Sequence, residues 1–448
     1  MSQNHGSSSV MSEIDSHLAN FAKLNGKAPS WLQQMREAAM ARFRDLGFPS
    51  THHEEWKYTN VAPLAKMAFH LPSPPERLDG IREQIERASL AVNTQMVFLN
   101  GRYLPELSSL GGLPGGARVG NLAALWEPEA DLLQRYLGRA VGYEHESFPA
   151  LNAAFLRDGA VVYVPRGVVL ADPIHLLFVS TAAGAPTISH PRILVVAEES
   201  SQAAVVESYV GFGDRAYCTN AVTEIFVGAN AQLTHYKIQR EAEGAFHIAT
   251  TQAQQARDSH FRSHAVSIGG RLARSDINTL LDGEGGECTF DGLYLASGRQ
   301  HVDHHTCIDH RKPRCSSREV YKGVLDGHST GVFNGKVFVR PDAQKSDASQ
   351  VNKNLLLSQD AVIDTKPQLE IFADDVKCSH GATIGRLDEG SVFYLRSRGI
   401  GESEARNLLI YAFANELIGR MRAEPVRVQL DRLLWSRFHD NPSAEVPL

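Results

Sequence analysis

The sequence predicts a mainly β protein whose long central region forms a solenoid, with helical segments at both ends. Three observations predict this architecture. From Ala160, short apolar and β-branched runs recur roughly every ten to twenty residues for more than 200 residues, with almost no helical pattern between them. Polar turns such as residues 198–200 separate the runs, without the Asn-Gly turns typical of hairpins. Several runs also carry polar residues on one face, as at His260, Arg262 and His264.

A long β region without helices is compatible with a sandwich, a barrel or a solenoid. A solenoid coil buries one narrow inward row and leaves its other face wet, and stacked neighbours complete the core. The loose period and the polar faces therefore favour the solenoid, although spacing alone leaves the other two folds open.

Residues 1–155 are predicted to form a mostly helical N-terminal domain. Residues 1–30 are expected to be frayed. Apolar residues recur at helical spacing from Trp31, and that helix should stop near Gly47. A short helix is expected at residues 81–90, and Asn100-Gly101 predicts a hairpin with a type I′ turn.

Residues 156–398 are predicted to be the β-helix core and residues 399–448 a helical C-terminal domain. The run at residues 391–395 reads as the last strand. Ser403 can then cap a helix. A second helix opens with Pro425 in its first turn. The first of these helices carries an apolar stripe made of Ala405, Leu409, Phe413 and Leu417.

Mutual packing is the default meaning of such stripes. Two helices with more than one apolar face have little else to bury against at the end of a solenoid, however, so we expect the stripe to bind a protein partner.

Composition is that of an ordinary soluble protein. Hydrophobic residues make up 43% of the chain, charged residues 21%, and the formal net charge is −6, which argues against nucleic acid as the main partner. Residues 1–10 have neither a basic start nor an apolar run, so we expect a cytoplasmic protein. Five cysteines at irregular spacing, without any Cys-x-x-Cys, indicate neither a disulfide framework nor a zinc ribbon.

Cys378 and His380 form the first candidate site. In an extended chain their side chains lie on one face, roughly 7 Å apart along the backbone, where a thiolate and an imidazole can meet one soft metal centre. An iron–sulfur cluster or a closed zinc site needs about four ligands, so the others must come from elsewhere. The alternative is a cysteine that merely packs in a strand beside a histidine.

A second candidate is the run of metal-capable side chains between residues 299 and 315. Strand alternation places one set on a common face: His301, Asp303, His305, Cys307 and Asp309. A metal or cluster role for His301, His305 and Cys307 is one hypothesis, and a ladder of stacked polar side chains is the other.

Nucleotide and serine-nucleophile signals are missing from the sequence. Gly331 to Lys336 resembles a Walker loop, but only three residues separate its glycines and Val337 replaces the required Ser or Thr. No Gly-x-Ser-x-Gly elbow occurs. We therefore do not expect this chain to hydrolyse ATP itself.

Five motifs in one order resemble the SufB/SufD family of the SUF iron–sulfur cluster assembly machinery. They are Tyr-Lys-Gly-Val-Leu-Asp-Gly at 321–327, Val-Phe-Asn-Gly-Lys at 332–336, Asn-Lys-Asn-Leu-Leu-Leu-Ser at 352–358, Asp-Thr-Lys-Pro-Gln-Leu-Glu-Ile at 364–371, and the stretch around Cys378. Gly-Phe-Pro at 47–49 and Glu-Trp-Lys-Tyr-Thr at 55–59 extend the resemblance over about residues 30–440. Gly381 and Gly385 favour the SufD branch.

The resemblance implies a right-handed parallel β-helix that pairs with a SufB-like paralogue, with each of the two chains holding one SufC-like ABC ATPase on its C-terminal helices. A transient iron–sulfur cluster would form at the shared interface, where Cys378 and His380 match the family's interface cysteine and histidine. Reduced FAD on the complex is a candidate electron source, and the chain alone does not decide its presence. A homodimer formed through the same sheet edge in isolation stays open.

Two functions of other classes remain as alternatives. One is a metal-dependent β-helix enzyme using the residues from His301 to His310, although no pair of carboxylates is singled out by spacing as its acid and base. The other is a purely structural subunit.

Overall fold

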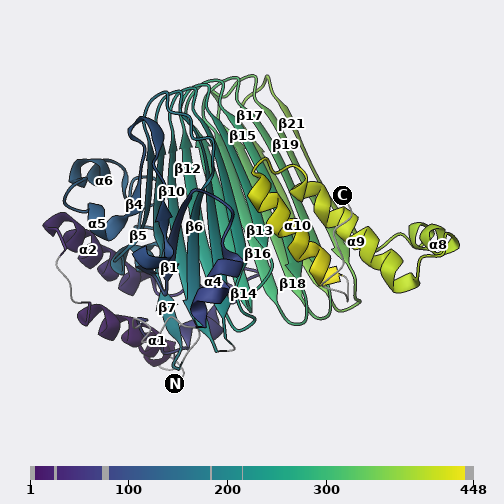
Figure 1. The fold of residues 1–448 in the computed structure, drawn as a ribbon, viewed down its shortest axis with the longest axis horizontal. Helices are drawn as coiled ribbons and strands as arrows, with labels where there is room; N and C mark the ends of the chain where they lie inside the picture. Colours follow the sequence, from purple (N-terminus) through teal and green to yellow (C-terminus); the bar gives the residue numbers. More distant parts are fainter. Residues whose placement is uncertain (1–5, 25–27, 73–79, 182–183, 214, 439–448) are drawn as a thin grey trace.

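The computed structural model describes residues 6–24, 28–72, 80–181, 184–213 and 215–438. Two long, mostly parallel sheets run along the molecule with their inner faces toward each other and form a flattened solenoid (Figure 1). Register partners such as Gln202, Gln232 and His260 show that one coil takes roughly 30 residues and contributes one strand to each sheet. This confirms the prediction of a parallel β-helix core with helical segments before and after it.

Sheet I has eleven strands, in the order β2-β1-β6-β9-β11-β13-β15-β17-β19-β21, with β3 paired to β1. Its strands are β1 (Thr94–Leu99), β2 (Arg102–Tyr103), β3 (Ser109–Leu110), β6 (Ile174–Thr181), β9 (Gln202–Phe212), β11 (Gln232–Arg240), β13 (His260–Ser267), β15 (Glu287–Ala296), β17 (Ser316–Leu325), β19 (Asp347–Leu356) and β21 (Lys377–Gly385).

Sheet II has ten strands, in the order β20-β18-β16-β14-β12-β10-β8-β5-β4, with β7 paired to β10. Its strands are β4 (Arg118–Asn121), β5 (Gly159–Val164), β7 (Thr187–Ser189), β8 (Arg192–Ala197), β10 (Tyr217–Val227), β12 (Phe246–Gln255), β14 (Leu272–Leu281), β16 (His301–His310), β18 (Thr330–Val339) and β20 (Val362–Ile371).

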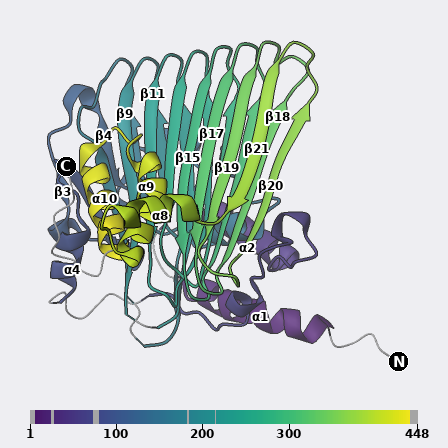
Figure 2. The ribbon, with the colours of Figure 1, turned by 90° about the vertical axis from the view of Figure 1, so that its right-hand side faces the viewer.

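The two ends of the solenoid differ. At the N-terminal end, the short antiparallel strands β2 and β3 flank β1, and antiparallel β4 covers the edge of β5. At the C-terminal end, β20 and β21 are the last strands of their sheets, and no described strand pairs with their outer edges (Figure 2). The described solenoid is therefore capped at one end and open at the other.

A single apolar row fills the inside of the coils. It runs from Met96 and Phe98 to Ala348 and Ala373, with Cys378 packed against it at the open end. Inward side chains alternate with outward ones along each strand, as the period of two requires. Stacked coils thus bury what no single coil could bury alone.

Helical segments precede the solenoid. They are α1 (Gly6–Ala22), α2 (Ser30–Leu46), η1 (Glu54–Trp56), α3 (Ala62–Ala65), α4 (Ile81–Ala88), η2 (Pro105–Leu107), η3 (Pro114–Gly116), α5 (Leu122–Leu125), α6 (Ala130–Tyr136) and α7 (Ser147–Ala154). Helices α2 and α7 pack on the outer face of sheet II, and α4 packs on sheet I. The helix that ends before Gly47 and the hairpin at Asn100-Gly101 are confirmed. Helix α1, with Ile14 in the apolar cluster around Phe43, corrects the expectation that residues 1–30 are frayed.

Three helices follow the solenoid: α8 (Glu389–Ser397), α9 (Glu402–Ile418) and α10 (Glu424–Phe438). The prediction of a last strand at residues 391–395 is wrong. Asp388 caps α8 by accepting a hydrogen bond from the Ser391 backbone N–H at 2.8 Å, and this local cap favours helix despite the β-prone side chains. Helix α9 begins at Glu402 after Gly401, so Ser403 lies inside it and is not its cap.

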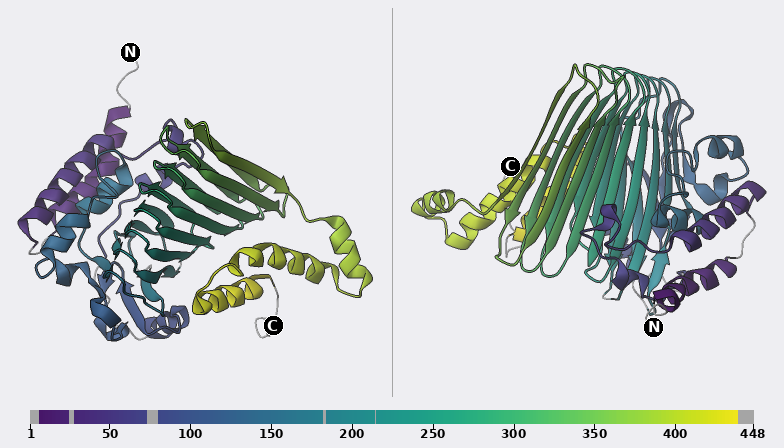
Figure 3. Two further views of the ribbon diagram at one scale, coloured as in Figure 1. Left: turned by 90° about the horizontal axis from the view of Figure 1, so that it is seen from above. Right: turned by 180° about the vertical axis from the view of Figure 1, so that it is seen from behind.

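Helices α9 and α10 lie along the outer face of sheet I, on a different side from α2 and α7 (Figure 3). Their side chains, among them Ile410, Leu417 and Leu430, pack on outward residues of sheet I such as Ile238 and Leu293. The premise that these helices lack a surface to bury against is therefore wrong. None of the helices within the described ranges is long and apolar enough to cross a membrane.

Candidate functional site

The candidate half-site lies on β21, the last strand of sheet I. Cys378 and His380 are register neighbours of Ala348 and Gln350, which both point into the solenoid. Cys378 is half-buried against the inner apolar row, and His380 is exposed at the open end. Strand β21 confirms that the chain is extended here with both side chains on one face.

The Cys378 thiol is not pre-ionised in the isolated chain. Burial raises its pKa, an effect that a backbone hydrogen bond to Ala348 only partly offsets. Metal ligation by this thiol must therefore displace a proton, and it will weaken as pH falls. Within the described ranges, no three His, Cys, Asp or Glu side chains gather closely enough to hold a metal ion. The chain thus offers two donors at this edge rather than a closed site.

The residues from His301 to His310 form β16 in sheet II, and their side chains alternate as predicted. Val302 and Ile308 belong to the inner apolar row. The opposite set faces outward, toward the N-terminal segment at residues 54–59: His301, Asp303, His305, Cys307 and Asp309. The outward face is therefore not an open ladder but an interface within the chain.

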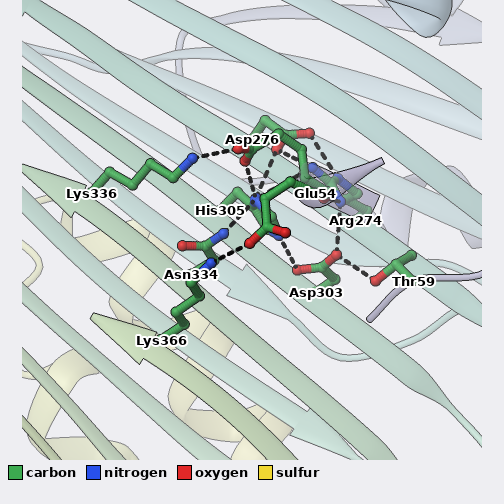
Figure 4. A network of polar contacts seen from close by, with 10 residues as sticks. Glu54, Thr59, Arg274, Asp276, Asp303, His305, Asn334, Lys336 and Lys366 are labelled. Atoms are coloured by element: carbon green, nitrogen blue, oxygen red, sulfur yellow. Dashed lines mark hydrogen bonds and ion pairs between the residues drawn. The ribbon is translucent and has the colours of Figure 1, made fainter. Parts of the chain in front are cut away.

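Residues 54–59 lie across the outer face of four coils, and we call this segment the N-terminal strap. Glu54 accepts a hydrogen bond from Lys366 on β20 at 2.5 Å, and Glu55 is paired with Lys336 on β18. Thr59 contacts Asp303 on β16 at 2.5 Å and the His301 ring at 2.8 Å. The strap thereby ties β16 and β18 to the last coil, as Figure 4 shows.

Arg274 on β14 joins the strap to the sheet. Its guanidinium donates to the Glu55 carbonyl oxygen at 2.6 Å and lies 3.8 Å from the centre of the Trp56 ring. It also pairs with Asp276 at 2.9 Å and Asp303 at 3.1 Å (Figure 4). Burial opposes the charge of Arg274, but these two carboxylates outweigh it and raise its pKa. Arg274 is therefore charged at any physiological pH.

His305 is held as a cation by the same cluster. Burial works against its charge, yet Asp303 at 3.1 Å, together with Glu55, raises the pKa of His305 to about 9. In return the His305 hydrogen bond, with Lys336, lowers the pKa of Glu55 to about 2. A protonated imidazole cannot ligate a metal, so the cluster in this state is a salt-bridge network.

Cys307 lines a cavity of about 570 Å³ between the strap, α7 and sheet II. Burial and the neighbouring Asp309 raise the pKa of Cys307 to about 12, so the thiol is protonated. Asp309 is itself held by Arg340 at 2.8 Å and Arg311 at 3.0 Å. The metal role of His301, His305 and Cys307 stays a prediction, and the contacts that these residues make here are hydrogen bonds and packing within the chain.

Sequence reasoning missed the strap as a structural unit. Glu54, Glu55, Thr59 and Arg274 were not among the candidate residues, because the strap contacts span from 219 to 312 positions along the chain. The available signal was the acidic pair Glu54-Glu55 that precedes Trp56.

At the C-terminal side, the apolar stripe of α9 contributes to packing within the chain. Ala405 and Leu417 are buried. Leu409 and Phe413 are half-buried and line a cavity of about 330 Å³ beside Thr383 and Ile384 of β21. Binding of a partner through these four residues stays a prediction.

Helix α8 instead presents the exposed aromatic residues. Phe393 is 71% exposed and Tyr394 58% exposed, on a helix that projects beyond the open end of the solenoid in Figure 1. Two large aromatic side chains exposed next to each other make α8 a candidate contact surface.

Two family models together match most of the chain. The SufBD protein N-terminal region matches residues 13–176, and the SUF system FeS cluster assembly SufBD core domain matches residues 178–413. The chain belongs to the SufB/SufD family of iron–sulfur cluster assembly proteins. The core match includes β21 with Cys378 and His380, and all of α8.

Curated relatives agree with this assignment over nearly the full chain. An iron–sulfur cluster assembly SufBD family protein of Synechocystis sp. is 36% identical over 91% of this chain and 92% of its own length. The iron–sulfur cluster assembly protein SufD of Escherichia coli is 33% identical over 86% of this chain and 88% of its own. SufD of Bacillus subtilis is 26% identical over 92% and 95%, respectively.

Proposed function

We propose that this chain is the SufD-type scaffold subunit of a SUF complex, and that it pairs with a SufB-like paralogue through the open end of its solenoid. The observation that carries the proposal is the last coil, where no described strand pairs with the outer edges of β20 and β21, beside the Cys378 and His380 half-site. The nascent iron–sulfur cluster is the cargo assembled at that junction.

The open end has the properties of a protein contact surface. Strands β20 and β21 are ten and nine residues long, and no strand in the described ranges hydrogen-bonds to their outer edges. Apolar side chains around them are exposed, with Val362, Ile371, Phe372 and Ile384 between 42% and 56% accessible. A second solenoid stacked on this edge would satisfy the backbone groups and cover the apolar residues together.

Half a coordination sphere suits a scaffold that must release its cargo. One thiol and one imidazole bind a cluster weakly, and a partner that supplies the remaining ligands makes binding depend on assembly. Separating the two chains would then lower the affinity for the cluster. This favours a scaffold over an enzyme with a resident metal.

ATP hydrolysis is assigned to a SufC-like ATPase partner. The Gly331 to Lys336 stretch lies within strand β18, where Phe333 and Val337 point into the core, so it forms no phosphate-binding loop. Helix α8, with Phe393 and Tyr394, is the surface we propose for the ATPase, next to the stripe residues Leu409 and Phe413.

We propose that the complex works in the cytoplasm, a proposal with which five free thiols are consistent, since a reducing compartment keeps cysteines unpaired. Reduced FAD bound to the complex is the proposed electron source. Flavin absorbance that co-purifies with the three-subunit complex, and not with this chain alone, would support it.

Co-purification with the SufB-like and SufC-like partners under anaerobic conditions tests the scaffold. We expect iron and sulfide on the complex but not on the isolated chain, and their loss in the variants Cys378→Ala and His380→Ala. Ser379→Ala, on the same strand between the two ligands, is the matched control and should behave as wild type. Full cluster assembly by His380→Ala would favour a purely structural subunit, and stoichiometric metal on the isolated chain would favour an enzyme.

Phe393→Ser with Tyr394→Ser tests the ATPase surface. The double variant should lose the ATPase subunit while it retains the SufB-like partner, because both side chains are exposed and contribute little to the fold. Val428→Ser, on the exposed side of α10, is the control. Undiminished ATPase binding by the double variant would contradict the assignment.

A further inference from the structure

On the strand next to His380, a buried amide oxygen has no hydrogen-bond partner in the described part of the chain. Gln350 on β19 is the register neighbour of His380 on β21, and its side chain is 1% exposed. Its Nε2 donates to the Glu319 carboxylate on β17 at 2.6 Å. Its Oε1 has no partner among the described residues. A buried carbonyl left unpaired in this way destabilises the folded state, so its retention calls for an explanation.

Glu319 determines which way the amide faces. An ionised carboxylate only accepts hydrogen bonds, so the amide nitrogen must face β17. The oxygen is thereby turned away from β17, and β21 is the strand on that side of β19. Thr306 lies beside the Glu319 carboxyl without an aligned hydrogen bond, and Glu319 is itself 1% exposed.

The core leaves space for this amide. Gly335 on β18 lies across the coil from Gln350, and a Cβ on Gly335 would come within 2.2 Å of the Gln350 Nε2. Glycine at that position keeps the amide in place at the level of His380, with no side chain to displace it.

Neighbouring strands in a sheet lie about 4.8 Å apart, so a glutamine oxygen can reach an imidazole on the next strand. Histidines that bind metals almost always donate their second ring N–H to an oxygen, which orients the ring and makes its other nitrogen a better ligand. The buried amide offers an oxygen at the required register position, and the exposed ring can turn to meet it.

We infer that Gln350, oriented by Glu319, is a positioning residue whose free carbonyl oxygen accepts the ring N–H of His380 when the other ring nitrogen binds iron of the cargo cluster. The inference rests on the proposed half-site and extends it inward by two strands. It assigns Glu319 the role of holding the amide, without contact to the cargo.

The test uses the complete complex with its SufB-like and SufC-like partners, loaded with iron and sulfide at pH 8. Burial raises the pKa of Glu319 to about 7, so the carboxylate form prevails at that pH. The readouts are the ferrous chelator concentration that removes half of the iron, and the histidine nitrogen coupling in the electron spin echo spectrum of the reduced cluster.

Gln350→Met keeps the length of the side chain and removes its oxygen. We expect half of the iron to be lost at a chelator concentration about 10–100-fold lower than for wild type, with an altered nitrogen coupling. Gln350→Glu combined with Glu319→Gln exchanges the carboxylate and the amide, keeps one hydrogen bond between the two side chains, and restores an acceptor at the same reach. This double variant should restore both readouts. Gly335→Ala, which displaces the amide without changing it, should reproduce the defect of Gln350→Met.

Asn352→Leu is the matched control. Asn352 is also a buried inward amide on β19, but its register neighbour on β21 is Ala382. We expect iron retention and nitrogen coupling near wild type for this variant. An equal loss in Asn352→Leu, or failure of the double variant Gln350→Glu with Glu319→Gln to restore retention, would show a structural effect and overturn the inference.

His380→Ala separates this inference from the proposed function. If His380→Ala retains iron and sulfide as wild type does, the half-site itself is refuted. If His380→Ala loses the cluster and its nitrogen coupling while Gln350→Met keeps both, the half-site stands and the positioning role of Gln350 is refuted.

Discussion

Arg274→Met should release the N-terminal strap and destabilise the folded chain. The Arg274 side chain is 3% exposed and neutralises Asp276 and Asp303, whose side chains are 15% and 0% exposed. Removing one partner of a buried ion pair costs about 3–5 kcal/mol. After the loss of Arg274, Asp303 keeps only His305, at 3.1 Å, as a charged partner. The Asp276 carboxylate is partly exposed and can be solvated by water, whereas Asp303 is fully buried, so most of this cost should come from Asp303.

The cause of the loss can be separated by a second substitution. Arg274→Met with Asp303→Asn removes the stranded charge and should recover about 1–3 kcal/mol, although the contact of Arg274 with the Trp56 ring stays lost. Urea denaturation followed by circular dichroism measures the free energy of unfolding. Hydrogen exchange of residues 54–59 reports release of the strap separately. A loss below about 1 kcal/mol in Arg274→Met, or no recovery in the double variant, would refute the charge-based reasoning.

Three further predictions concern stability and packing. The pKa of His305 is raised to about 9, so its contribution to the free energy of unfolding, up to roughly 3 kcal/mol, is present below about pH 6.5 and is lost as pH rises toward 9. The wild-type Tm should fall over this pH range, and the Tm of His305→Gln should not. The same fall in Tm in His305→Gln as in wild type would contradict this prediction. Gly292→Ala should lower the free energy of unfolding by about 1–3 kcal/mol, because the new Cβ would lie 2.0 Å from the Tyr321 ring. In urea denaturation, adding Tyr321→Leu should recover part of that stability. Equal stability of Gly292→Ala and wild type would exclude the close contact. Truncation after residue 402 removes α9 and α10 and uncovers the apolar outer face of sheet I, so the truncated chain should appear in the insoluble fraction. The double variant Phe393→Ser with Tyr394→Ser should stay soluble. A soluble, folded truncated chain would show that the two helices are dispensable for the core.

The sequence could predict those features that depend on local pattern. Strand alternation placed Cys378 and His380 on one face, and the spacing of apolar runs favoured coils over a sandwich. The left-handed conformations of Asn100 and Gly101 produced the expected hairpin. In each of these cases the controlling residues lie within one element or one coil of each other.

Features that depend on distant contacts could not be predicted in this way. Alternation put His305 and Cys307 on an outward face, but only the fold shows that the strap covers that face and that His305 carries a charge. Likewise, α9 and α10 cover strands from β9 to β19 that precede them by up to about 200 residues. Helix α8 was missed for a local reason: the β-prone Val392, Phe393 and Tyr394 outweighed the cap at Asp388 in the reading of the sequence.

The capped N-terminal end of the solenoid limits how large an assembly can grow. Parallel coils are open to indefinite stacking in principle, and two exposed ends would let chains add head to tail into fibres. Here antiparallel β2, β3 and β4 already occupy one end. The described part of each molecule therefore offers one end for coil stacking, and joining two such ends would close the assembly at a pair.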